Sequence, residues 1–165
     1  MSDWAAKRFW SNVATECCDT QHVILLDDRL VKTPAKATLA VPTQAMAEAI
    51  VAEWDAQSDK IDPRTMPTTR SANAAIDKVT PQQAEVVALI AAYGEDDFLC
   101  YRAPAPQELI EQQKQAWDPI LAWAADALDA PLRTVKGVIH IEQPANSVRN
   151  LTAQVEVQTP FQLAA

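Results

Sequence analysis

The stretch that most constrains the fold is residues 42–77, because it joins two parts of the chain with different patterns. Within it, apolar residues recur at steps of three and four, which places them on one face of an α-helix. These residues are Met46, Ala47, Ile50, Val51 and Trp54. Since Pro42 is well suited to a helix start, the pattern predicts a helix over residues 43–57.

Before this helix, residues 8–42 read as short strands separated by turns. The β-rich runs are residues 23–26, 30–33 and 37–41. Asp27-Asp28 lies between the first two runs and predicts a tight turn, and residues 18–21 predict another. A small antiparallel sheet of this kind buries only one face. We therefore expect the helix over residues 43–57 to cover it.

After Pro67 the chain reads mostly as helices. Helices are expected from Pro67 to about residue 79, from Thr80-Pro81 to Gly94, over residues 106–117, from Asp118-Pro119 onward, over residues 146–157 and from Pro160. Trp123 is expected inside the helix that Asp118 caps, and residues 135–143 form an extended arm or strand. The predicted fold class is α+β, with a small antiparallel β-rich domain followed by a mainly helical, orthogonal bundle-like domain.

Residues 58–66 form a polar connection that contains Pro63. We place the domain boundary there, which predicts one domain of residues 1–63 and a second of residues 64–165. The final helix starts at Pro160, close to the last residue, Ala165. Helices that short are marginal without packing. We therefore expect the sequence to be the front part of a longer protein, with an incomplete helical domain.

Composition excludes several classes of function. Two glycines among 165 residues leave no G-x-G-x-x-G motif or P-loop, which need glycine for close approach to phosphate. A net charge of −8 disfavours nucleic acid, which is bound by clustered Lys and Arg.

No apolar run is long enough to cross a membrane. Residues 1–4 carry no signal segment. Three cysteines make no disulfide framework, so we expect a reducing compartment, such as a cytosol or a mitochondrial matrix.

Neither the cysteines nor the histidines form a recognisable site. Cys17, Cys18 and His22 lie near one another, but their spacing fits no zinc pattern and a tetrahedral site needs four ligands. A cysteine nucleophile would pair Cys17 or Cys100 with His22 or His140, and no local motif supports such a pair. The sequence therefore predicts no catalytic residue, no metal and no cofactor.

One acidic and aromatic stretch leaves an enzyme open as the alternative. Asp96 and Asp97 precede Tyr101 and Arg102, and paired acids in a cleft would suit a small hydrolase or transferase. The other interpretation is a solvated loop that leads Phe98 and Leu99 into the core. The enzyme hypothesis predicts a deep pocket that encloses Asp96, Asp97 and Tyr101.

Taken in order, several motifs in residues 8–124 resemble one family. They are Arg8-Phe9-Trp10, Leu26-Asp27-Asp28-Arg29, Lys32-Thr33-Pro34-Ala35-Lys36, Val41-Pro42-Thr43, Glu53-Trp54-Asp55-Ala56-Gln57, Met66-Pro67 with Thr69, Ala75-Ile76-Asp77, Asp97-Phe98-Leu99-Cys100-Tyr101-Arg102, Gln113, Trp117, Asp118-Pro119 and Trp123. The ordered set resembles the ATP synthase assembly chaperones that serve the alpha subunit of the soluble catalytic sector, known in mitochondria as assembly factor two.

The resemblance implies a chaperone and not an enzyme. Members of this family have a β-rich N-terminal domain and a helical C-terminal domain, and occur in mitochondria and alphaproteobacteria. They bind the unassembled alpha subunit until the beta subunit replaces them. The family continues with further helices and an acidic, tryptophan-containing region that this sequence lacks.

The expected partner is accordingly the ATP synthase alpha subunit, bound by a monomeric protein without membrane insertion. A third hypothesis is a general adaptor with a different protein partner. Candidate partner-binding residues combine the family motifs with mixed aromatic and charged character, which is typical of interface anchors. They are Trp54, Asp55, Arg64, Met66, Asp97, Tyr101 and Arg102.

Overall fold

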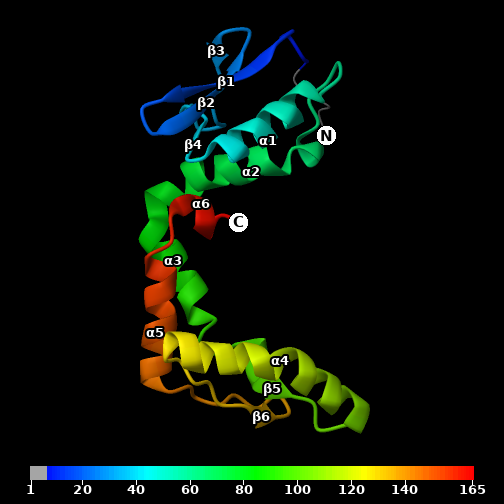
Figure 1. The fold of residues 1–165 in the computed structure, drawn as a ribbon, viewed down its shortest axis with the longest axis vertical. Helices are drawn as coiled ribbons and strands as arrows, with labels where there is room; N and C mark the ends of the chain where they lie inside the picture. Colours follow the sequence, from blue (N-terminus) through cyan, green and yellow to red (C-terminus); the bar gives the residue numbers. More distant parts are fainter. Residues whose placement is uncertain (1–6) are drawn as a thin grey trace. The chain divides into compact units, whose positions relative to one another are not determined.

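A computed structural model describes residues 7–165. The expectation that residues 1–4 carry no signal segment falls outside this range. Contacts divide the chain into two compact units. The first unit comprises the described residues up to Gln82 together with Thr159–Ala165, and the second is Gln83–Gln158. Figure 1 shows the strands β1 to β4 with α1, α2 and α6, which belong to the first unit, and α3, α4 and α5, which belong to the second.

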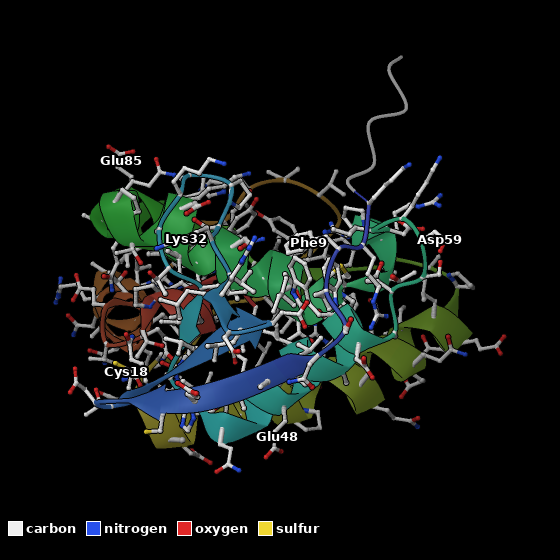
Figure 2. The ribbon with its side chains drawn as sticks, turned by 90° about the horizontal axis from the view of Figure 1, so that it is seen from above. Phe9, Cys18, Lys32, Glu48, Asp59 and Glu85 are labelled. Atoms are coloured by element: carbon white, nitrogen blue, oxygen red, sulfur yellow. The ribbon has the colours of Figure 1, made fainter. Side chains whose placement is uncertain are left out.

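The first unit contains an antiparallel sheet built around β2 (Gln21–Leu26). On one edge β2 pairs with β1 (Val13–Cys18), and its other edge is shared by β3 (Arg29–Leu30) and β4 (Ala40–Val41). Asp27 and Asp28 connect β2 to β3 with φ of 47° and 67°, as a type I′ turn requires. The predicted tight turn is therefore confirmed. Figure 2 shows Cys18 at the tip of the hairpin, at the opposite end of the sheet from Phe9.

Helix α1 (Gln44–Asp55) packs against β1, β2 and β4, as predicted. Thr43 caps its start, because its hydroxyl accepts a hydrogen bond from the Met46 amide at 3.3 Å. Ala47 and Ile50 lie one turn apart and are fully buried. Together with the inward face of the sheet they form the core. Its buried members are Trp10, Ile24, Leu26, Val31, Leu39, Val41, Ala47, Ile50 and Ala72.

Below α1 lies a second helical layer (Figure 1). It consists of a short 3₁₀ turn, η1 (Pro63–Thr65), then α2 (Pro67–Ala74), a π-helical turn, η2 (Ala75–Val79), and a 3₁₀ turn, η3 (Thr80–Gln82). The terminal helix α6 (Pro160–Leu163) packs against η2, and Phe161 contacts the core. This packing supplies the stability that so short a helix lacks by itself.

The second unit is mainly helical. It contains α3 (Gln83–Ala92), the 3₁₀ turn η4 (Phe98–Cys100), α4 (Gln107–Leu128) and α5 (Ala145–Glu156). Helix α3 packs against α5. Strands β5 (Tyr101–Arg102) and β6 (Val135–Lys136) form a two-stranded parallel pair. The expected extended segment over residues 135–143 is thus a strand only at its start.

One prediction about α4 was wrong. Asp118 and Pro119 do not begin a new helix, because α4 runs unbroken from Gln107 to Leu128 with Pro119 inside it. A proline inside a helix removes one backbone hydrogen bond, but the helix can continue past it with a kink. Trp123 lies within the helix, as expected, and is 58% exposed. The buried face of this helix instead includes Ala124.

The α+β fold class is confirmed, with the antiparallel sheet and its covering helix first and the mostly helical part after it. The contact division falls after Gln82, whereas the sequence pattern places a domain boundary after Pro63. Helix α2 contacts α1, and residues 67–82 belong to the same unit as the sheet. The domain boundary as a limit of independent folding stays a prediction. Among the described residues, no helix combines the length and apolar character needed to cross a bilayer.

Candidate partner-binding surface

The motif Glu53-Trp54-Asp55-Ala56-Gln57 holds the helices of the first unit together. Glu53, at the end of α1, accepts hydrogen bonds from the amides of Thr68 and Thr69 at 2.6 and 2.8 Å, and from the Thr69 hydroxyl at 2.7 Å. Its carboxylate thus satisfies the free amides at the start of α2. Burial alone would raise the pKa of Glu53, but these hydrogen bonds outweigh it and hold the pKa below its usual value.

Gln57 performs a similar task at the end of α1. It is 5% exposed, and its amide group donates to the Glu53 carbonyl at 2.9 Å and the Thr65 hydroxyl at 3.1 Å. Its side-chain oxygen accepts from the Asp62 amide at 2.7 Å. The side chain therefore fixes the connection between α1 and η1. A polar residue buried with every group paired is a structural element of the fold.

Of the candidate residues in this unit, two are structural in their contacts. Trp54 packs edge-on against Trp10, with ring centroids 5.2 Å apart. Met66 is 2% exposed. Asp55 remains exposed and pairs with Arg8 at 3.3 Å. Arg8 also donates to the Asp55 carbonyl at 2.8 Å. This hydrogen bond stabilises the C-terminal end of α1, because the last carbonyl groups of a helix have no donor within the helix.

Arg64 is the most accessible candidate in the first unit. Its side chain is 89% exposed and pairs with Asp62 at 2.8 Å. Hydrogen bonds from Arg64 lower the pKa of Asp62. The pair is local in sequence and leaves the guanidinium at the surface, where a partner could reach it.

In the second unit, the acidic and aromatic stretch forms a surface turn. Asp97 caps η4, because its Oδ1 accepts from the Leu99 amide at 2.7 Å. The Tyr101 hydroxyl donates to Asp96 and lies 3.4 Å from His140 Nδ1. The hydrogen bond to Asp96 raises the pKa of Tyr101 and lowers that of Asp96. Asp96 and His140 are both about two-thirds exposed, at 63% and 65%.

Arg102 connects several elements of the second unit. Its side chain is only 12% exposed and pairs with Asp118 of α4 at 2.7 Å. Its Nε donates to the Leu99 carbonyl at 2.9 Å, and its guanidinium lies over the Trp117 ring, 5.4 Å from the centroid. The motifs around residues 97–102 and 117–118 therefore meet in space.

The geometry does not fit the hydrolase or transferase alternative. Of the hollows described in residues 7–165, none is lined by Asp96, Asp97 or Tyr101. The two acids also serve different contacts, one at the Tyr101 hydroxyl and the other at the start of η4. Acid–base chemistry would need converging groups in an enclosed site.

The described part of the chain contains no group of three or more potential metal ligands. Cys17 pairs with His22 across the β1–β2 hairpin, and Cys17 and Cys18 are exposed free thiols. Cys100 is buried, and burial raises the pKa of its thiol, which disfavours a nucleophilic thiolate.

Sequence reasoning did not identify the exposed apolar side chains of the second unit. Leu89 and Tyr93 lie four residues apart on and just after α3 and are 66% and 69% exposed. On α4, Ile120 and Trp123 lie three residues apart and are also exposed. Val138 and Ile139 follow β6 and are 91% and 78% exposed. For α4, the sequence carries one signal that could have indicated Ile120 and Trp123. They lie three residues apart, so they share a face of the helix, and that apolar face can remain at the surface.

Comparison with known proteins places this architecture among chaperones. Residues 7–125 match the family described as ATP12 chaperone protein. The structure is similar to that of Paracoccus denitrificans Atp12p, with 45% identity, a TM-score of 0.93 and coverage of 98% of this chain and 70% of that one. A point mutant of the same protein gives a TM-score of 0.94, also at 45% identity, covering 99% of this chain and 70% of the mutant's.

Two further relatives extend the comparison. A solved structure of an Agrobacterium tumefaciens protein has 36% identity and a TM-score of 0.89, with coverage of 96% of this chain and 60% of that one. The mitochondrial protein atp12 of Schizosaccharomyces pombe is 28% identical over 171 residues, which cover 96% of this chain and 59% of that protein. This chain therefore spans well under two-thirds of the length of the fission yeast protein.

The matched residues and the shared fold define a protein of the assembly-chaperone class. The chain belongs to the ATP12 chaperone family. The resemblance to ATP synthase assembly chaperones is thereby confirmed, and the relatives in Paracoccus and Agrobacterium fit the expected alphaproteobacterial source.

Proposed function

We propose that this protein binds the unassembled alpha subunit of ATP synthase and shields it until the beta subunit takes its place. The observation that carries the proposal is the match of nearly the whole chain to Atp12p at 45% identity. The protein acts as a monomer in a bacterial cytoplasm, or in the mitochondrial matrix for a eukaryotic form.

The physical requirement for such a chaperone is a surface that covers apolar area and later releases it. A subunit separated from its neighbour exposes apolar surface, which favours aggregation. The second unit carries exposed apolar side chains on α3, α4 and the segment after β6, which suit contact with such a surface. Release requires that the alpha subunit bind the chaperone less tightly than it binds the beta subunit. Such a difference in affinity depends on the quality of packing and on the cost of ordering side chains more than on the buried area.

Binding by the seven candidate residues is part of this proposal. Arg64 and Asp55 offer charge at the surface of the first unit, and Tyr101 offers a phenol at the second. Asp97 and Arg102 are partly covered, and Trp54 and Met66 support the fold beneath the surface. The accessible residues are therefore the ones expected to contact the client.

The test is capture of purified alpha subunit by the immobilised protein. Free alpha subunit is expected to be retained, and added beta subunit is expected to release it. The beta subunit alone is the specificity control, and it is not expected to be retained. Failure to retain folded, soluble alpha subunit would contradict the proposal.

Side-chain substitutions then locate the surface. Trp123→Ala is expected to weaken capture about fivefold or more, as for a truncated aromatic anchor, and Arg64→Ala by a smaller factor. Lys78→Gln, at an exposed position of η2, is the matched control. Equal capture by all three variants would place the binding surface elsewhere.

A further inference from the structure

A small hollow in the second unit is rich in positive charge. Its volume is about 290 Å³, and its lining includes Arg102, Gln113, Lys114, Asp118, Thr134 and Lys136. Three cations thus face one carboxylate, in a chain whose net charge is −8. An accumulation of one sign of charge in a concave site raises the local concentration of the opposite ion.

The register of the short parallel pair brings two of these cations together. Arg102 in β5 is paired with Lys136 in β6, and neighbouring strands lie only about 4.8 Å apart. Like charges at directly paired positions destabilise a sheet. Asp118 pairs with Arg102 at 2.7 Å, but Lys114 and Lys136 have no ion pair within residues 7–165.

Arg102 also has an unused hydrogen-bond donor. Its Nε and Nη1 bond to the Leu99 carbonyl and to Asp118, but its Nη2 is buried and has no acceptor among the described residues. A buried donor without an acceptor is costly, and most so on a charged group. An acceptor brought into this hollow would relieve that cost and the repulsion between Arg102 and Lys136.

From these features we infer that the hollow binds a single carboxylate, supplied by an acidic side chain of a polypeptide partner. The volume lies at the lower end of the range of about 300–1,000 Å³ for small-molecule sites, and so suits one side chain better than a large cofactor. A guanidinium is well matched to a carboxylate, and the two lysines add charge at the rim. Only the identity of that partner as the ATP synthase subunit rests on the proposed function.

The test is a nuclear magnetic resonance titration of the full chain, followed at the indole N–H of Trp117, which lies beneath the Arg102 guanidinium. The probe is N-acetyl-glutamic acid α-amide, whose only charge is its side-chain carboxylate. The matching glutamine compound is the neutral control, and inorganic phosphate is a separate arm. The glutamic acid compound is expected to bind, and the neutral one is not.

Charge variants give the decisive comparison. Lys136→Gln and Lys114→Gln are each expected to weaken binding about two- to fivefold, the range for partly exposed charge pairs. Asp118→Asn keeps an acceptor for Arg102 but removes the competing charge, so it is expected to strengthen binding by a similar factor. Lys78→Gln, in the first unit, is the control and leaves binding unchanged.

Binding of phosphate without binding of the glutamic acid compound would overturn the inference. So would equal affinities of the Lys114, Lys136 and Lys78 variants, or weaker binding by Asp118→Asn. The probe needs no client protein. Failure of the chain to capture the alpha subunit would therefore overturn the proposed function without changing this result.

Discussion

At the scale of single residues, most of the family motifs in the first unit maintain the fold. Asp77 accepts the Thr33 hydroxyl at 2.6 Å and the Ala35 amide at 3.0 Å, so it ties the turn after β3 to η2. Asp27 accepts the amides of Ser11 and Asn12 at 3.0 and 2.8 Å. These motifs identify the family because the fold depends on them, which does not by itself make them contacts for a partner.

The Glu53 carboxylate is expected to contribute to stability in a pH-dependent way. Glu53→Gln weakens charged hydrogen bonds at the start of α2 and should lower the free energy of unfolding by about 1–3 kcal/mol at pH 7. Urea unfolding measures this difference. Glu48→Gln, on the exposed face of α1, is the control and should change stability little.

The sign of the pH effect follows from the depressed pKa of Glu53. Its stabilising contribution is fully present above the pKa of the unfolded chain and is lost as the pH falls through the lower folded-state pKa. The difference between Glu53→Gln and the native protein should therefore shrink in acid. A difference that stays constant from pH 7 to pH 3 would contradict this account.

The Tyr101–Asp96 hydrogen bond gives a second residue-scale prediction. Asp96 raises the pKa of Tyr101, so Asp96→Asn should shift the Tyr101 titration to lower pH. The chemical shift of the ring carbon bearing the hydroxyl reports that titration, and Tyr101→Phe assigns the signal. Glu95→Gln is the neighbouring control, and an equal shift in this variant would point to general charge instead of the hydrogen bond.

At the scale of elements, patterns local in sequence were predictable and contacts distant in sequence were not. The helical repeat predicted α1, and the Asp27-Asp28 pair predicted the tight turn between β2 and β3. Nothing in the sequence pattern indicated that Glu53 would cap α2 or that Asp118 would reach Arg102. The expected break at Pro119 failed because proline is favourable at a helix start, yet tertiary packing can retain it in a helix interior.

Helix α4 supplies the element-scale prediction. Pro119 lacks the N–H that would donate to the Gln115 carbonyl, so Pro119→Ala should restore one helical hydrogen bond and strengthen the helix. Hydrogen exchange should slow at the amides of residues 120–123, compared with the native protein. The exposed substitution Ala122→Ser, one turn further along the same helix, is the control. Faster exchange in Pro119→Ala would show that the proline favours this conformation.

At the scale of the whole molecule, the two units differ in how they bury apolar area. The first has a contiguous core between the sheet and its helices. Among the described residues of the second, the buried apolar side chains are the small ones of Ala124, Ala130 and Cys100, and Gln143 and Ser147 are buried polar residues. Aromatic and aliphatic side chains on α3 and α4 remain at the surface. Sequence patterns could show that these helices are apolar, but not which of their faces stays uncovered.

The contact division predicts how local loosening spreads. Asp77→Asn should weaken the link between the turn after β3 and η2, and so speed hydrogen exchange around residues 33–37 and 75–82. Exchange in Gln83–Gln158 should not change, since that segment belongs to the other unit. Lys78→Gln serves again as the control. Spread of the effect into the second unit would contradict the division.

The return of Thr159–Ala165 to the first unit affects the order in which the chain can fold during synthesis. Phe161 packs against the core that the sheet and α1 begin to form. The ribosome supplies that side chain only after all of Gln83–Gln158 has been made. The segment made in between can therefore acquire its helices first, while the earlier β-rich part lacks one core contact until residues 159–165 emerge.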